Sequence, residues 1–331
     1  MHTKTFLIYL SLLIFQSCNI STSNFKKDQS IDAATRQEIK VLNDKLFKAI
    51  TTNDLTALQS LMAPGLFDKF ESDIKTTLLR YSDFKIDSYD ILDEFSVHNS
   101  NSGNNSITLL SGNSNDNDYI VHFESANVDN YVSLLLLNNG DSKFLVTVIY
   151  GRYDGQWKIN ILKLGQYWIY GKTAPDYYKL ARASYKKSYL IDAIDYISLA
   201  NLCIRPTGDY FQFNQEKEIK EFEDTLMKEV NAKFQFPMTL ENIESKPQLF
   251  RIYPELREEG FFPMIDYIST IDLKDTIALK IENQKIQQEV HSLFKGIDED
   301  KKYVFYSAFG EMPDGQKKVS GYGFTDTLKN R

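Results

Sequence analysis

The first part of the chain repeats hydrophobic residues at the spacing of helices. Between positions 33 and 81 an apolar side chain returns every three or four residues in three successive segments, so each segment has one apolar face. Asn53-Asp54 ends the first segment and offers an N-cap to the second, which stops before Pro64-Gly65. The pattern predicts three amphipathic helices. Their expected core-facing residues are Ile39, Leu42, Leu46, Phe47, Ile50, Phe67, Phe70, Ile74 and Leu78.

From residue 83 the period changes to the alternation that is typical of β-strands. Apolar and polar residues alternate in KIDSYDILDEFSVH, ITLLSG and DYIVHFES, and longer apolar runs follow in YVSLLLLNN and FLVTVIY. Asn139-Gly140 and Asp154-Gly155 lie between apolar runs, where hairpin turns occur. The pattern therefore predicts an antiparallel meander of five or six strands after the three helices.

This order of elements, together with the sequence YDGQWKI within residues 150–159, resembles the NTF2-like (SnoaL-like) superfamily. The resemblance covers roughly residues 33–170. It implies that residues 33–172 form an α+β domain in which a strongly curved antiparallel sheet wraps the helices as a cone with an open mouth. It implies a pocket but no particular chemistry, because the same cone serves enzymes, ligand binders and structural modules.

Residues 173–231 return to helical spacing, and their first part resembles one tetratricopeptide repeat of about 34 residues. The positions that carry this resemblance are Tyr177, Leu180, Ala181, Tyr185, Ala193, Ile197, Ala200 and Pro206. It implies a helical hairpin. Because stable repeat arrays need about three units, we expect this hairpin to dock against its neighbours rather than form a peptide-binding solenoid. A charged linker helix is predicted to follow, with Ile219, Phe222 and Leu226 on one face.

The last segment, residues 232–331, mixes both periods. FQFPMTL, GFFPMIDYISTIDL, KKYVFYSAFG and KVSGYGFTDTL have the composition of strands, and ALKIENQKIQQEVHSLF, between the second and third of them, has the pattern of a helix. We expect a small C-terminal α+β domain. The predicted fold class of the whole chain is accordingly α+β.

The chain opens with a short apolar run, FLIYLSLLIF, at residues 6–15. A membrane-spanning helix needs roughly 20 apolar residues, so this run is too short to cross a bilayer. It also lacks the polar face of a core helix, whereas Lys4, the compact apolar region and Ser17 are typical of a secretory signal. We expect residues 1–17 to be a signal peptide.

Ser17-Cys18, directly after this run, resembles the lipobox of bacterial lipoproteins. The resemblance implies cleavage before Cys18, a lipid on that cysteine, and attachment of the protein to a membrane of the bacterial cell envelope, facing the periplasm or the cell surface. Residues 18–32 are polar and lack periodicity, so we expect a flexible lipidated tether. The alternative is an ordinary secreted protein in which Cys18 is incidental.

The charge of the chain argues against a nucleic-acid partner, and its cysteine content argues against a disulfide and a catalytic thiol. The net charge is −7 and the lysine pairs are scattered, so no basic stripe is available for a nucleic-acid partner. With lipid on Cys18, Cys203 is the one remaining thiol and no intramolecular disulfide can form. Cys203 lies in a helical stretch with no histidine within 80 residues, so we expect a core side chain rather than a nucleophile.

Residues with catalytic or metal-binding potential are few. The three histidines outside the signal, His98, His122 and His291, are far apart, and no zinc, calcium, phosphate-loop or nucleophile-elbow spacing occurs. We therefore expect no metal and no cofactor. One acidic group in the first domain is predicted to be a solvated strand face. It consists of Asp87, Asp90, Asp93 and Glu94.

His122 and Glu124 are the candidates for a catalytic pair. Strand alternation places both on one face of YIVHFE, where they would be able to transfer a proton if that face lined the cone. The opposite face carries Tyr119, Val121 and Phe123 and is more apolar, so it is the expected interior. The favoured interpretation of His122 is therefore a surface or rim histidine.

Aromatic residues cluster near the end of the meander and offer a further hypothesis. They are Tyr150, Tyr153, Trp157, Tyr167, Trp168 and Tyr170. Such residues form sugar- or peptide-stacking surfaces, and they also fill cores and sheet faces. Packing is the favoured interpretation.

Two main functions compete, and a purely structural subunit of an envelope complex is a third possibility. The first is a lipid-anchored envelope protein without enzymatic activity, which binds a protein, a peptide or a small molecule, with the cone as candidate ligand pocket. The alternative is an envelope enzyme, a hydrolase or an isomerase, with its site in the cone. The lining of the cone discriminates them, since an enzyme needs His122 or paired carboxylates inside it.

Overall fold

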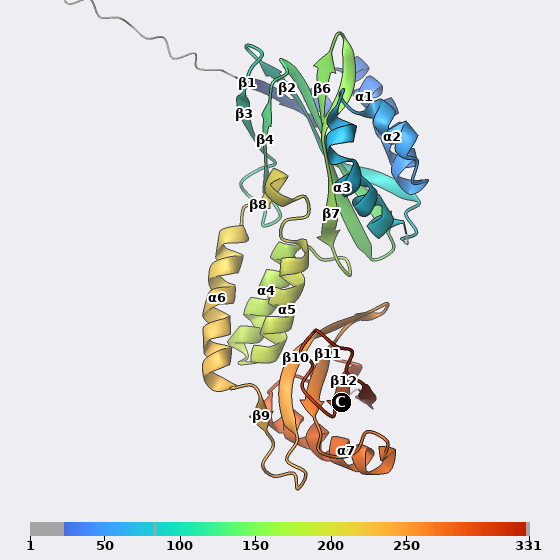
Figure 1. The fold of residues 1–331 in the computed structure, drawn as a ribbon. Helices are drawn as coiled ribbons and strands as arrows, with labels where there is room; N and C mark the ends of the chain where they lie inside the picture. Colours follow the sequence, from blue (N-terminus) through green and yellow to red (C-terminus); the bar gives the residue numbers. More distant parts are fainter. Residues whose placement is uncertain (1–22, 83, 329–331) are drawn as a thin grey trace, which may run out of the picture.

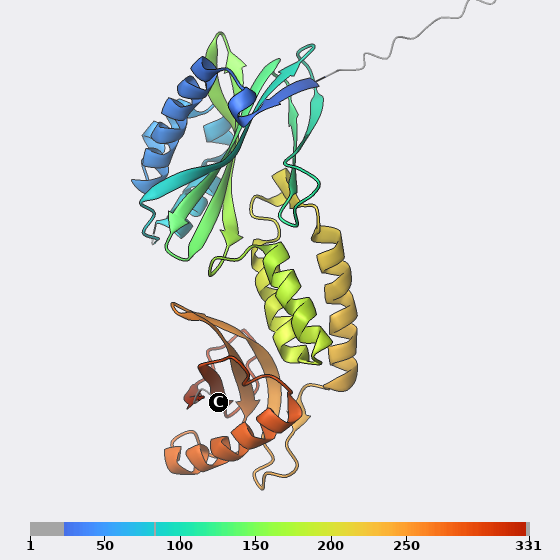
Figure 2. The ribbon, with the colours of Figure 1, turned by 180° about the vertical axis from the view of Figure 1, so that it is seen from behind.

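The computed structural model describes residues 23–82 and 84–328. It is a mixed α+β fold with seven α-helices and three sheets in these residues. Figures 1 and 2 show three parts arranged one after another along an elongated molecule. An N-terminal domain, in which helices pack on a sheet, lies at one end. A group of three helices forms the middle, and a smaller α+β domain lies at the other end.

The three predicted N-terminal helices are present. They are α1 (Ala33–Thr51), α2 (Leu55–Leu61) and α3 (Leu66–Tyr81). The side chain of Asp32 caps α1 by accepting from the Thr35 N–H, and Asp54 caps α2 through the Ala57 N–H, as predicted from Asn53-Asp54. Gly65 begins α3 at φ +74°, a left-handed conformation that favours glycine.

The main sheet is antiparallel, in the order β1-β2-β5-β6-β7. Its strands are β1 (Ser23–Lys27), β2 (Ser88–Asn99), β5 (Asp129–Asn139), β6 (Ser142–Tyr153) and β7 (Gln156–Trp168). Helices α1 to α3 cover one face of it (Figure 1). Asp154 and Gly155 both have positive φ, 47° and 82°, which confirms the predicted two-residue hairpin between β6 and β7.

Two strands of the predicted meander belong to a second sheet rather than to the main sheet. Strands β3 (Asn105–Leu110) and β4 (Tyr119–Ser125) pair with each other and with β8 (Phe211–Phe213) in a second sheet. This sheet packs against the face of the main sheet opposite the helices, where Ile107 and Val121 join one core cluster with Leu134. Strand β5 is therefore buried on both faces, which explains its unbroken apolar run.

Residues 23–32, which belong to the expected flexible tether, include a strand and a 3₁₀ turn. Ser23–Lys27 pair along the edge of β2, with Ser23 opposite Asn99 and Lys27 opposite Phe95, and a short 3₁₀ turn, Asp28–Ser30, leads into α1. An exposed strand edge offers unpaired backbone groups to any segment nearby. The described part of the predicted tether is thus a strand, whose partner lies too far along the chain for local periodicity to reveal.

The predicted helical hairpin and linker helix form the middle of the molecule. They are α4 (Ala174–Lys186), α5 (Leu190–Cys203) and α6 (Glu216–Lys233), with a 3₁₀ turn at Gly208–Tyr210 before β8. Ala181, Ala193 and Ala200 are fully buried, which lets the helices pack closely. Gly165 of β7 accommodates the carbonyl of Pro206, since a Cβ there would lie 1.7 Å from that oxygen.

The C-terminal domain places one helix on one sheet. The sheet order is β13-β12-β11-β10-β9, and α7 (Thr276–Leu293) connects the parallel neighbours β11 and β12. The strands are β9 (Met238–Thr239), β10 (Gln248–Arg257), β11 (Gly260–Ile268), β12 (Tyr303–Phe309) and β13 (Gly321–Thr327). Strand β10 is absent from the sequence prediction because Arg251, Pro254 and Glu255 interrupt its alternation.

Candidate functional site

A pocket of about 180 Å³ lies between the N-terminal helices and strand β7. We name it the helix–sheet pocket. Its apolar wall consists of Ile50, Leu58, Met62, Leu66, Phe70, Ile74, Leu78, Ile161, Leu162 and Leu164. The remaining lining residues are polar: Asp73, Thr77, Asn160, Lys163 and Tyr210.

Local irregularities on both sides of this pocket shape it. Helix α3 departs from helical geometry at Phe70, with φ −121° and ψ 16°. On the sheet side, the β6–β7 register shifts between Ile149 and Tyr150, which leaves Asn160 as an extra residue in β7. Asn160 is fixed by hydrogen bonds to Asn127 (2.7 Å) and from the Tyr153 hydroxyl (2.7 Å). The sequence predicts Phe70 and Ile74 as core residues; the bulge that opens the space beside them has no local sequence signal.

The polar lining residues of the helix–sheet pocket are not arranged as a catalytic pair. Asp73 and Lys163 are exposed, and within the described residues no ion pair joins them. Lys163 instead lies over the ring of Tyr210, 5.8 Å from its centroid. Proton transfer needs an acid and a base within hydrogen-bond reach of the reacting group. The pocket has an apolar wall, and charged side chains are among its other lining residues. Such a lining is suited to binding an apolar ligand rather than to catalysis.

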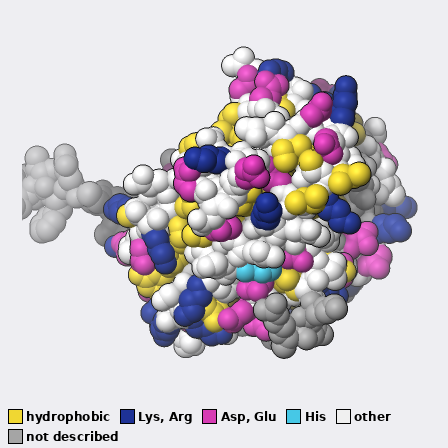
Figure 3. Space-filling model, turned by 90° about the horizontal axis from the view of Figure 1, so that it is seen from below, with side chains coloured by type: hydrophobic (Ala, Val, Ile, Leu, Met, Phe, Trp, Pro, Cys, Tyr) yellow, Lys and Arg dark blue, Asp and Glu magenta, His cyan; other side chains and the backbone are white. Residues whose placement is uncertain are grey.

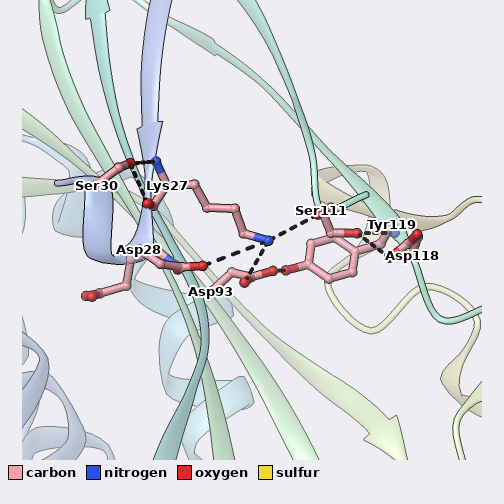
Figure 4. Close-up of polar contacts among 8 residues, drawn as sticks. Lys27, Asp28, Ser30, Asp93, Ser111, Asp118 and Tyr119 are labelled. Carbon is pink, nitrogen blue, oxygen red and sulfur yellow. Dashed lines mark hydrogen bonds and ion pairs between the residues drawn. The ribbon is translucent and has the colours of Figure 1, made fainter. Parts of the chain in front are cut away.

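A second group of polar side chains holds β1 against the rest of the domain (Figure 4). Lys27 Nζ lies 2.9 Å from Asp93 Oδ1 and donates to the Ser111 carbonyl at 3.1 Å. The Tyr119 hydroxyl donates to the other oxygen of Asp93. Burial raises the pKa of Asp93, and the hydrogen bonds from Tyr119 and Lys27 offset part of that rise. Each member has a partner, so the cluster connects β1, β2 and β4 structurally.

The predicted solvated acidic face is only half correct. Asp87 and Asp90 are exposed, and Asp90 pairs with Lys143 at 2.8 Å. Asp93 and Glu94 are not solvated: the Asp93 side chain is 14% exposed, and Glu94 is buried. The two side chains point to opposite faces of β2, and both faces are covered: Asp93 bonds to Tyr119 of β4, and Glu94 lies near Arg36 of α1. Burial raises the pKa of Glu94, with partial compensation from the Tyr131 hydroxyl and Arg36.

The candidate pair His122 and Glu124 lies on the exposed face of β4, while Tyr119, Val121 and Phe123 are buried. The favoured interpretation of His122 as a surface residue agrees with this position. Its Nδ1 is 3.0 Å from the Thr108 hydroxyl, and neither residue lines the helix–sheet pocket.

The other two histidines lie elsewhere, each beside a carboxylate. His98 Nδ1 is 2.7 Å from Asp129, and His291 lies 3.8 Å from Asp298 and 3.4 Å from Asp326. In the part of the chain that the structure describes, no group of three or more His, Cys, Asp or Glu side chains is placed to hold a metal ion.

Of the two cysteines, Cys203 lies within the described residues and Cys18 lies outside them. Cys203 is fully buried in α5 and donates to the Leu199 carbonyl at 3.3 Å, and burial raises the pKa of its thiol to about 12. A thiol that stays protonated is a poor nucleophile, so the prediction of a core cysteine is confirmed. Cys18 and the predicted signal peptide lie outside the described residues.

Comparison with known proteins adds no family. No protein-family model matches the chain, and no curated protein matches it. Among the helices that the structure describes, none is long and apolar enough to cross a membrane.

Proposed function

We propose that this protein is a lipid-anchored cell-envelope protein that binds a small apolar ligand, without catalysis, in the helix–sheet pocket. The observation that carries the proposal is the lining of this pocket, in which ten apolar side chains face about 180 Å³ of space. In this proposal the N-terminal domain is an NTF2-like cone and the pocket is its interior. The three helices followed by a mainly antiparallel sheet support that assignment.

The volume indicates the size of the ligand. An apolar protein cavity of about 150 Å³ holds one benzene molecule. A pocket of about 180 Å³ therefore suits a single or fused ring, or the end of an alkyl chain. Asp73 and Lys163 offer partners for a polar group on such a ligand.

The catalytic alternative lacks support from the positions of its candidates. An enzyme of the proposed kind needs His122 or paired carboxylates in the pocket, and His122 and Glu124 lie on the exposed face of β4 instead. Binding is for this reason the function that we propose for the cone.

The proposed partners follow from the surface and the N-terminal sequence. The face in Figure 3, at the C-terminal end, intersperses basic with acidic side chains, and together with the net charge of −7 this supports a partner other than a nucleic acid. The membrane partner rests on Cys18 and the apolar run before it. The α4–α5 hairpin packs between the two domains, which supports a connecting role rather than a repeat array.

The test uses indole as a compact apolar probe, with binding measured by saturation-transfer NMR. Ile74 is half-buried and lines the pocket, so Ile74→Trp fills the space and is expected to weaken indole binding at least about tenfold. Val41→Trp is the matched control, because Val41 lies on α1, is 44% exposed and does not line the pocket. Equal indole binding in both folded variants contradicts the proposal.

A further inference from the structure

A second pocket, of about 290 Å³, lies where the three parts of the molecule meet. We name it the junction pocket. The connection between β7 and α4 contributes Tyr170 and Lys172, the helical hairpin contributes Tyr177 and Tyr196, and the C-terminal domain contributes the β10–β11 turn and the segment before β12. None of these residues belongs to the helix–sheet pocket.

Aromatic rings form the walls of the junction pocket. The rings of Tyr177 and Tyr196 stack with centroids 6.4 Å apart, and Phe261 meets Tyr196 edge-on at 5.3 Å. The hydroxyl of Tyr177 donates to the Ile169 carbonyl at 2.7 Å, and that of Tyr170 donates to the Arg257 carbonyl at 2.6 Å. The hydrogen bonds anchor the side chains of Tyr177 and Tyr170, and the ring contacts orient Tyr196 and Phe261, so the pocket presents apolar faces before any ligand arrives.

One cation is built into this aromatic wall. The Lys301 ammonium lies 6.0 Å from the Tyr196 ring centroid and 5.9 Å from that of Phe261, and its side chain is 7% exposed. It donates to Asp192 at 3.3 Å and to the Glu299 carbonyl at 3.5 Å. An ammonium has three donors, and the described residues supply acceptors for two of them. One N–H of a lining residue is thus available to a ligand.

Charged side chains of both signs lie at the mouth. Lys302 pairs with Glu259 at 3.0 Å, so these two charges compensate each other. Lys172 and Asp300 are exposed, and neither takes part in an ion pair within the described residues. The mouth therefore offers a free donor group and a free acceptor group, with no net charge from these four side chains.

The junction pocket combines aromatic stacking faces, hydrogen-bond donors and acceptors, and balanced charge. Together these features indicate one class of ligand. A second organic cation would compete with Lys301 for the same rings. An anion would face Asp300 and Glu259, while the charge of Lys301 is already paired with Asp192. A hydrocarbon would leave the N–H of Lys301 without a partner. A sugar satisfies all of these groups, because its C–H faces stack on rings while each hydroxyl both donates and accepts.

We propose that the junction pocket binds a neutral sugar, of the size of a mono- or disaccharide. The aromatic residues near the end of the β-strands supply only one side chain to it, Tyr170. Tyr150, Trp157 and Tyr167 are buried in the core, and Tyr153 is exposed at the β6–β7 turn. The stacking surface is assembled instead from distant segments, which the sequence does not bring together.

The test titrates the full-length mature protein, in a sugar-free detergent, with maltose and with N,N′-diacetylchitobiose, and records saturation transfer to the sugar ring protons. Transfer to at least one sugar is expected at roughly 10 mM or below. Tyr196→Ala removes a stacking face and is expected to weaken binding about tenfold. Tyr322→Ala is the matched control, since Tyr322 on β13 is 37% exposed and lies outside both pockets.

Lys172→Met is the second variant, because the Lys172 side chain is exposed, makes no ion pair in the described residues, and supplies one donor at the mouth. It is expected to weaken sugar binding with an unchanged unfolding midpoint. The proposal is overturned by absence of transfer to both sugars, by equal binding in Tyr196→Ala and Tyr322→Ala, or by preference for the zwitterionic dipeptide Ala-Ala. Indole binding to the helix–sheet pocket is independent of each of these outcomes, so failure of one proposal is distinguishable from failure of the other.

Discussion

Asp195 is a carboxylic acid in the interior of α5 with 0% exposure. Neither of its oxygens has a hydrogen-bond partner in the described residues. Burial raises the pKa of Asp195 well above its ordinary value, the neighbouring Asp192 adds to the rise, and Lys301 opposes it. The protonated form is consequently the one that the folded protein accommodates.

The raised pKa predicts a pH-dependent stability. The stability contributed by protonated Asp195 is fully present below its unfolded pKa, near 3.8, and is lost as the pH rises through the raised folded pKa. Asp195→Asn cannot ionise and escapes this loss. The unfolding midpoint of the variant minus that of the wild type is expected to grow by at least about 2 °C between roughly pH 4 and pH 8.

Asp224→Asn provides the control for this measurement, because Asp224 is an exposed residue of the neighbouring helix α6. Its difference from the wild type is expected to stay flat across the same range. A difference for Asp195→Asn that is constant with pH, or that shrinks as the pH rises, argues that Asp195 is ionised in the folded protein.

At the scale of elements, β1 is the clearest case of a strand held by side chains. The strand has five residues, and their backbone bonds to β2 are supplemented by the contacts of Lys27 with Asp93 and Ser111. The Lys27 side chain is 30% exposed, so this ion pair is only partly shielded from water. Its removal leaves a half-buried carboxylate with less compensation.

Lys27→Met is therefore expected to destabilise the N-terminal domain by about 1–3 kcal/mol and to speed amide hydrogen exchange in β1. Lys40→Met breaks an exposed pair with Asp44, at 2.7 Å on α1, and is expected to change stability by at most about 0.5 kcal/mol. Urea unfolding of both variants measures the difference. Equal stabilities would show that β1 is held by its backbone pairing alone.

The sequence predicts well the elements whose pattern depends on residues close together in the chain. The helical spacing from Ile39 to Leu78 and the Asp154-Gly155 turn depend on neighbouring residues, and both are observed. The partners of β1 lie about 70 residues away, and β3 and β4 pair with a strand that follows α5. No periodicity encodes such pairings.

Neither pocket could be predicted from the sequence, and the physical reason is the same for both. Phe70 and Leu162 line the helix–sheet pocket, and Tyr196 and Lys301 line the junction pocket, yet in sequence each pair is about 90 to 105 residues apart. The candidates His122 and Glu124 are adjacent on a strand, which makes them easy to find. Proximity along the chain selects residues that share a face, whereas a pocket gathers residues from several elements.

At the scale of the whole molecule, membrane attachment is the property to test. Cys18→Ser is expected to abolish palmitate labelling and to move the protein from the membrane fraction to the soluble fraction, because the lipid supplies the proposed anchor. Cys203→Ala keeps the proposed attachment cysteine and removes only a buried thiol, so its labelling and partition are expected to equal those of the wild type. Unchanged partition of Cys18→Ser would overturn the proposed anchor.

Under the proposed lipid anchor, the start of β1 fixes how far this protein would reach from a bilayer. Only five residue steps separate Cys18 from Ser23, a contour of at most about 18 Å. β1 begins at the end of the molecule opposite the C-terminal domain (Figures 1 and 2). The proposed lipid on Cys18 would thus keep the N-terminal domain beside the headgroups and lift the junction pocket into the aqueous layer above them. At that height the proposed sugar site would meet soluble or wall-bound glycans before the sugars of lipids, and lengthening the chain between Ser21 and Ser23 would change which of these it samples.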